Sequence, residues 1–80
     1  MDKDKVIERI NYHISAIAGI DETELVPTQN LREDLDFDSL DEVDLVIRLE
    51  HEFHISISDD DILHIKTIQD VFNTIDVCMK

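Results

Sequence analysis

The residues of this sequence that are best suited to chemistry are a serine and the carboxylates around it. Residues 34–45, DLDFDSLDEVDL, contain six carboxylates and one hydroxyl group, which belongs to Ser39. A hydroxyl in this setting could cap a helix, attack a substrate as a nucleophile, or belong to a metal-binding loop. Each kind of site makes its own demands on the neighbouring residues, so each can be compared with the sequence.

The sequence suits a helix cap at Ser39 and does not suit a nucleophile. Ser39 precedes Glu42 by three residues, which is the spacing of a capping box, so the Ser39 oxygen is expected to accept a backbone N–H bond. A nucleophilic serine needs a neighbouring base or a G-x-S-x-G turn, and the sequence has neither beside Ser39. We therefore predict no catalytic residue. A cap alone, however, does not explain the surrounding acids.

A tight calcium loop is rejected, and a histidine metal site is not favoured. Asp34, Asp36 and Asp38 match positions 1, 3 and 5 of an EF-hand, but position 6 is Ser39 instead of Gly and position 12 is Leu45 instead of Glu. His51 and His54 are three residues apart, and no third ligand is evident in the sequence. No metal site is predicted, although weak binding of divalent ions by the clustered carboxylates stays open.

The elements that must position Ser39 are predicted to be helices. Apolar residues at helical spacing indicate a first helix from Lys3 to Ala18, which Gly19 ends. A long connection over 20–38 contains the only proline, and its Leu25, Val26, Leu31 and Leu35 are expected to pack back onto the helices. Further helices are predicted over residues 40–53, over residues 59–64 and after Thr67, with residues 54–58 as an extended linker. The expected fold is one all-α domain over residues 1–80, with three main helices and a short one.

The helix predicted over 40–53 has two apolar stripes where a bundle needs one. Stepping at 100° per residue places Leu45, Val46, Leu49 and Phe53 on one arc, which is the expected core face. A second arc lies well away from the first and begins beside Ser39. The long connection could cover this second arc, or it could be an exposed docking strip flanked by carboxylates. Its members are Leu40, Val43 and Ile47.

The charge of the chain is strongly acidic and uneven. The sequence has 20 acids and 7 bases, and the stretch from Glu33 to Asp61 holds twelve acids with one base, Arg48. Nucleic acid is therefore an unsuitable partner, whereas basic patches on other proteins would be attracted; a merely solvated acidic face is the alternative. One cysteine, Cys78, no long apolar run and no signal-peptide pattern suggest a cytoplasmic protein with no membrane span.

The order of these segments resembles the acyl carrier protein family. DSLDEVDLVIRLEHEF is similar to the family signature, Asp-Ser-Leu followed by an acidic amphipathic helix that ends in Glu-x-Phe. ISISDDDI and IKTIQDVFNTI resemble the following segment and the last helix, so the likeness covers nearly the whole chain. The sequence departs from the usual pattern at Asp36, where the family has Gly, at Phe37, and at Arg48 and His51, where small or acidic residues are usual.

The resemblance implies that Ser39 is a point of attachment. In this family the serine is esterified by 4′-phosphopantetheine, which a holo-carrier synthase (a phosphopantetheinyl transferase) takes from coenzyme A with magnesium, and the arm's thiol holds acyl groups as thioesters. Asp38 is expected to help this synthase organise the metal-bound phosphate. The rest of the site implied by the resemblance is a helix that recognises partner proteins by docking on basic patches of acyl-processing enzymes. Its expected contact residues are Leu40, Asp41, Asp44, Ile47 and Glu50.

Three functions are compatible with this resemblance. The first is a monomeric carrier for separate enzymes of fatty acid synthesis, which catalyses nothing itself. The second is a specialised carrier for aminoacyl or secondary-metabolite groups. The third is an acidic helical adaptor that has no prosthetic group. A bulky Phe37 before the serine is expected to stiffen the turn and to offer an apolar contact near the arm.

The crowded charge leads to a prediction that does not depend on the family. Because residues 33–61 carry a net charge of −11, self-repulsion should lower the stability at low ionic strength. We expect the melting temperature to rise when salt or magnesium is added, over ionic strengths from about 0.01 M to about 1 M. Circular dichroism can follow this change, and an unchanged melting temperature would contradict the clustering of charge.

Overall fold

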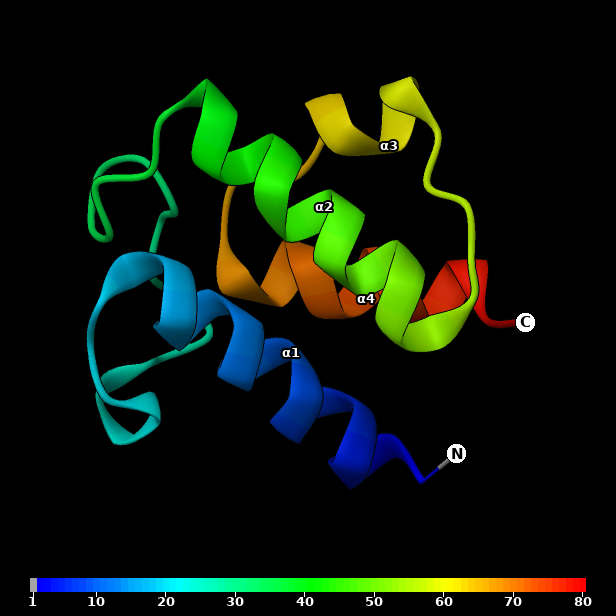
Figure 1. Cartoon of the computed structure of the whole chain (residues 1–80), viewed down its shortest axis with the longest axis horizontal. Helices are drawn as coiled ribbons and strands as arrows, with labels where there is room; N and C mark the ends of the chain where they lie inside the picture. The colour runs from blue at the N-terminus through cyan, green and yellow to red at the C-terminus, as the bar shows by residue number, and fades with distance from the viewer. Residues whose placement is uncertain (1) are drawn as a thin grey trace.

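Residues 2–80 fold into four α-helices and a 3-10 turn. The structure is a computed structural model that describes residues 2–80, and it has no β-strand within them, which confirms the predicted all-α class. None of the helices in this range is long and apolar enough to span a membrane. The elements in chain order (Figure 1) are α1 (Lys3–Ala18), η1 (Glu22–Glu24), α2 (Ser39–Phe53), α3 (Asp59–Leu63) and α4 (Ile68–Cys78).

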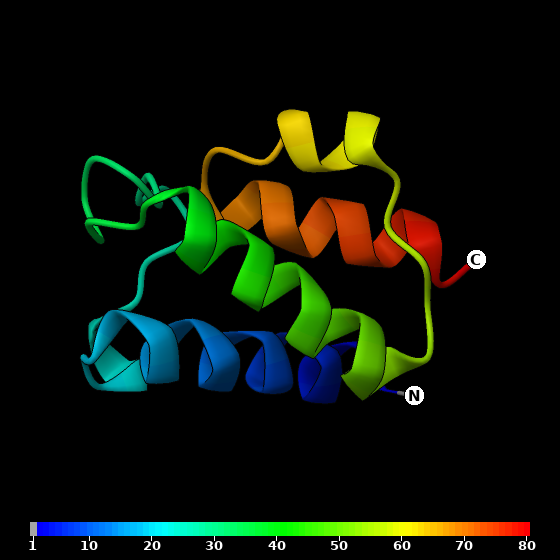
Figure 2. The ribbon, with the colours of Figure 1, turned by 45° about the horizontal axis from the view of Figure 1, so that its top comes forward.

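The helices pack with α2 between the two other long helices. Figure 2 shows α1 and α4 running in opposite directions, with α2 crossing obliquely from the side of α4 to the side of α1. The short helix α3 lies above α4, and the long connection between α1 and α2 closes one end of the bundle. The start of α2, where Ser39 lies, is at this looped end.

The core is aliphatic and is built from the predicted stripes. Every residue that α2 buries belongs to the stripe expected to face the core, and α1 buries Ile10 and Ile14 of its predicted face. Residues 54–58 are an extended linker, as expected, and bury Ile57. The buried apolar side chains are Ile10, Ile14, Leu31, Leu35, Phe37, Leu45, Val46, Leu49, Phe53, Ile57, Ile68, Val71 and Ile75.

The long connection is held to the segment that joins α3 to α4. The Leu31 N–H donates to the Lys66 carbonyl at 2.9 Å, and the Ile68 N–H donates to the Gln29 carbonyl at 3.1 Å. Leu31 and Leu35 are buried as predicted, whereas the prediction that Val26 packs inward is wrong, because this side chain is exposed. These hydrogen bonds join backbone groups and do not depend on particular side chains. They explain how so long a connection is held against the helices.

The ends of the helices follow from local residue types. Gly19 ends α1 with φ 74°, and His54 ends α2 with φ 54°, a left-handed conformation that suits Gly better than His. Thr67 and Asp70 form the predicted capping box at the start of α4, and both the Thr67 and the Lys66 N–H groups donate to Asp70 Oδ2 at 3.0 Å. Although burial raises the pKa of Asp70, these backbone N–H bonds outweigh it and lower the pKa.

A cluster of polar side chains joins α1 to α2. Arg9 donates from Nε and Nη2 to Glu52 Oε1 at 3.0 and 2.7 Å, and His13 Nε2 lies 3.0 Å from the same oxygen. The hydrogen bond from Arg9, followed by that from His13, lowers the pKa of Glu52. The sequence did not predict this contact, because Arg9 and Glu52 are far apart in the chain and each could pair with several other residues.

The Asp70 carboxylate should stabilise the fold in a pH-dependent way. Since its pKa is lowered on folding, the contribution is complete above the unfolded pKa of about 3.9 and is lost as the pH falls through the folded pKa. We expect Asp70→Ala to cost about 1 kcal/mol at neutral pH, the usual scale of a lost cap, and the difference from wild type to shrink below about pH 4. Urea unfolding at several pH values measures this difference. Asp76→Ala, on the exposed face of α4, is the control and should show no such loss.

Candidate functional site

Ser39 is the first residue of α2 and is exposed. The prediction that its oxygen caps the helix is wrong by one residue: Asp38 is the cap, and it forms a capping box with Asp41. The Asp41 N–H donates to Asp38 Oδ1 at 2.9 Å, and the Asp38 N–H donates to Asp41 Oδ2 at 3.1 Å. Within residues 2–80 the Ser39 hydroxyl makes no hydrogen bond, so it is available for reaction on a fixed helix end.

The turn before Ser39 is fixed by a left-handed residue and a buried ring. Asp36 has φ 58°, which Gly adopts without strain and other residues adopt less readily. Phe37 is part of the core, and its N–H donates to the Leu31 carbonyl at 2.9 Å. The expectation that Phe37 offers an apolar contact near an arm on Ser39 is therefore corrected, because the ring anchors the turn from inside.

An apolar strip runs along the exposed side of α2 from Ser39. Leu40 is 78% exposed, Val43 is 50% exposed and Ile47 is 48% exposed, so the long connection does not cover them. These three residues are called the docking strip below. The acids beside the strip are Asp41 and Asp44, of which Asp44 is about half exposed. The structure thus shows that the second arc is exposed, while docking of a partner there stays a prediction.

Several acids of α2 already have partners within the chain. Arg48 Nε donates to Asp44 at 3.2 Å, and Glu50 accepts a hydrogen bond from the Ile57 N–H at 2.9 Å, which holds the α2–α3 linker. Arg32 donates from Nε and Nη2 to the two oxygens of Glu42 at 3.0 and 2.9 Å. These bonds raise the pKa of Arg32, first through the hydrogen bond to Glu42 and then through the charge of this carboxylate. No periodic or capping pattern in the sequence indicates the contact between Arg32 and Glu42.

The groups considered for metal or thiol chemistry lie apart. Among residues 2–80, no three His, Cys, Asp or Glu side chains are placed to hold a metal ion together. His51 and His54 are both exposed near the end of α2. Cys78 is half-buried in the last turn of α4, and burial raises the pKa of its thiol, so the reactive thiolate is disfavoured.

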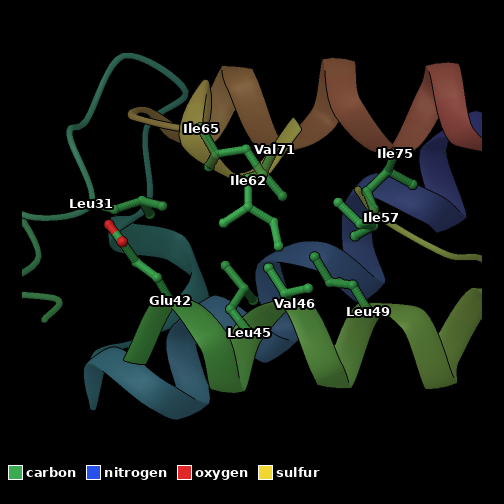
Figure 3. A pocket seen from close by; sticks show the side chains of 10 residues that line it. All are labelled: Leu31, Glu42, Leu45, Val46, Leu49, Ile57, Ile62, Ile65, Val71 and Ile75. Atoms are coloured by element: carbon green, nitrogen blue, oxygen red, sulfur yellow. The ribbon is translucent and has the colours of Figure 1, made fainter. Parts of the chain in front are cut away.

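A small cavity lies beneath α2. Its volume is about 10 Å³, and Figure 3 shows its side chains converging from α2, α3, α4 and the long connection. Glu42 lies at one end beside Leu31, one helical turn beyond Ser39, and it is the only charged residue of the lining. The lining is Leu31, Glu42, Leu45, Val46, Leu49, Ile57, Ile62, Ile65, Val71 and Ile75.

Comparison with known proteins agrees with this geometry. Residues 9–75 match the family model for the phosphopantetheine attachment site. An inferred acyl carrier protein from Mycobacterium tuberculosis is 40% identical with a TM-score of 0.85, and the match covers 90% of this chain and 96% of that one. The acyl carrier protein from Enterococcus faecalis, a subject of thermal-stability studies, is 28% identical with a TM-score of 0.82, and the match covers 98% and 99% of the two chains.

The fold and the family match define a helical carrier of a covalent 4′-phosphopantetheine group, which is not an enzyme. The chain belongs to the acyl carrier protein family. The residues at the start of α2 fit such a group, because an exposed hydroxyl that makes no hydrogen bond within the described residues can be esterified without disturbing the core. A phosphate ester there would also lie at a helix N-terminus, where the macrodipole favours negative charge.

The left-handed Asp36 gives a prediction about the turn that positions Ser39. We expect Asp36→Gly to raise the free energy of unfolding by up to about 1 kcal/mol and Asp36→Val to lower it by about 1–2 kcal/mol, because only Gly relieves the positive φ. Chemical denaturation measures both values. If Val is tolerated as well as Gly, the turn does not have the conformation described here.

Proposed function

We propose that Ser39 carries the 4′-phosphopantetheine arm, and that the protein holds acyl groups on it as thioesters for separate enzymes of fatty acid synthesis. The observation that supports this most is the exposed Ser39 hydroxyl, which the Asp38–Asp41 cap leaves without a structural task. In the attachment step the Ser39 oxygen bonds to phosphorus and loses its proton. The diphosphate bond of coenzyme A breaks, and adenosine 3′,5′-bisphosphate leaves.

Asp38 is proposed to assist this attachment from its place at the helix cap. Its Oδ1 accepts the Asp41 N–H, and the residue is exposed next to Ser39. Because this cap fixes the carboxylate, Oδ2 can help a transferase to hold magnesium on the incoming phosphate. The transferase supplies the remaining ligands, since the carrier itself has no metal cluster within residues 2–80.

The partner surface is proposed to be the docking strip with its neighbouring acids. Leu40 and Ile47 offer apolar contacts, and Asp41 and Asp44 offer charge to a basic patch beside an enzyme entrance. Solvated acids contribute little each, so they should govern the rate of association and the choice of partner more than affinity. Glu50 is also proposed for this surface, with one oxygen bonded to the Ile57 N–H.

The cavity favours a simple acyl cargo over a polar one. Nine of its ten lining residues are apolar, so an alkyl chain could be sheltered there if the cavity, of about 10 Å³, widened to admit it, whereas an aminoacyl group would find few hydrogen-bond partners. Specialised carriage of aminoacyl or secondary-metabolite groups is therefore the second candidate. The family match opposes the third, an adaptor without a prosthetic group. A monomeric state and a cytoplasmic location stay predictions.

The attachment is tested by intact mass. Wild type and Ser39→Ala are incubated with coenzyme A, magnesium and a broad-specificity phosphopantetheinyl transferase, and we expect the mass of one phosphopantetheine to be added to the wild type alone. Ser39→Ala should have the same free energy of unfolding as the wild type, because the Ser39 side chain is exposed and makes no hydrogen bond in the part of the chain that the structure describes. A gain of mass on the Ala variant would place the attachment at another residue.

The same assay tests the docking strip. Leu40→Ala and Asp44→Lys should lower the rate of mass gain, the second most strongly at low salt, without changing its final extent. Gln69→Ala, exposed on α4, is the control. Equal rates for all of these variants would contradict the proposed partner surface.

A further inference from the structure

The cavity beneath α2 is next to a hollow on the surface. This hollow has a volume of about 300 Å³. The cavity has a volume of only about 10 Å³, which is room for about one water molecule. Both spaces are lined by Glu42, Ile62 and Ile65, so these three side chains separate the cavity from solvent. Any chain that enters the cavity from the end near Ser39 must pass between them.

The Arg32–Glu42 ion pair spans this boundary. Arg32 belongs to the long connection and lines the hollow, and it holds both oxygens of Glu42 at 2.9–3.0 Å. The Arg32 side chain is 61% exposed, whereas that of Glu42 is 19% exposed. Figure 3 shows the Glu42 carboxylate at the end of the cavity beside Leu31. The pair therefore ties the first turns of α2 to the long connection across the cavity entrance.

Hydrogen bonds anchor the backbone of Arg32 within the long connection. The Arg32 N–H donates to Asn30 Oδ1 at 2.9 Å, and Leu31 is bonded to the Lys66 carbonyl. The backbone of Asn30 also forms an isolated antiparallel β-bridge with that of Thr67, the residue before α4. Because the Arg32 backbone is held in place, opening the entrance requires that the Arg32 and Glu42 side chains separate and that the bonds between them break.

We propose that the Arg32–Glu42 pair is a latch that determines whether the cargo chain enters the cavity. With the latch closed, the chain and its thioester stay outside. With the latch open, the Glu42 side chain rotates toward solvent. An alkyl chain then passes between Leu31, Ile62 and Ile65, and these side chains move apart to widen the cavity. This inference rests on the proposed function, because it needs an acyl chain on Ser39.

The latch also defines which cargo it controls. A long alkyl chain gains free energy by leaving water and can compete with the ion pair, at about 0.8 kcal/mol per buried CH₂ group. An acetyl group has too little apolar surface to do so. We therefore expect the Arg32–Glu42 pair to affect octanoyl carriers and to leave acetyl carriers unchanged.

The test measures how fast hydroxylamine cleaves the thioester. Wild type, Arg32→Gln and Glu42→Gln are loaded from octanoyl-coenzyme A or acetyl-coenzyme A by a broad-specificity transferase, and the loading is verified by intact mass. We expect Arg32→Gln and Glu42→Gln to slow octanoyl cleavage by about 1.5- to 5-fold, the effect of losing one partly exposed ion pair. The acetyl rates should not change.

Three controls separate the latch from a general effect on stability. Arg9→Gln breaks an Arg–Glu pair away from the cavity and should not slow cleavage. Arg32→Glu combined with Glu42→Arg reverses the pair and should return the octanoyl rate toward wild type. Salt at about 1 M should slow cleavage in wild type but not in Arg32→Gln, because it screens the pair.

The possible failures can be told apart. If no variant gains the mass of the arm, the proposed function fails. If all proteins are loaded but Arg32→Gln changes the octanoyl and acetyl rates by the same factor, or changes neither, the latch is overturned and the carrier function stands. The folded state of each variant is verified by its circular dichroism spectrum, which should match the wild type because Arg32 is largely exposed.

Discussion

The burial of one face of α2 is the interaction on which the rest of the structure depends. Leu45, Val46, Leu49 and Phe53 enter an aliphatic core, and each contributes roughly 1.5–3 kcal/mol relative to an exposed side chain. This gain must offset the repulsion among acids that the same helix brings together. Because the buried face fixes the rotation of α2, it also fixes which residues face solvent, and so it presents the docking strip and Ser39 together.

The three arginines of the chain are placed where they can stabilise this helix. The three arginines of the sequence each bind a carboxylate of α2: Arg9 binds Glu52, Arg32 binds Glu42, and Arg48 binds Asp44. Two of these pairs connect α2 to other elements, near its two ends. The carboxylates left for a partner are thus fewer than the sequence suggests, since Asp41 and Glu50 accept backbone N–H bonds. The basic patch proposed for a partner would have to compete with these internal contacts, which favours brief association.

Local patterns in the sequence predicted the helices well, because each depends on residues within one or two turns. The start of α2 differs by one residue for a physical reason: Asp38 and Ser39 are both good caps, and each has an acid three residues on. In the structure, Asp38 is the cap, and its N–H donates to Asp41. Glu42, which would complete a capping box with Ser39, is instead bonded to Arg32, a residue outside the helix. Contacts between residues far apart in the chain, like the one between Arg9 and Glu52, leave no periodic pattern in the sequence from which they could be predicted. The exposure of Val26 leaves no such pattern either.

The shift of the cap has a chemical consequence for the serine. A capping serine has its oxygen committed to a backbone N–H, and esterification would compete with this bond. With Asp38 as the cap, the Asp38 side chain stabilises the start of the helix. The hydroxyl of the next residue, Ser39, is then left without a hydrogen bond within residues 2–80. The Arg32–Glu42 pair keeps Glu42 away from the cap and also places a charge at the end of the cavity. One ion pair therefore links the free hydroxyl of Ser39, the proposed attachment residue, to the proposed closure of the cavity beneath α2.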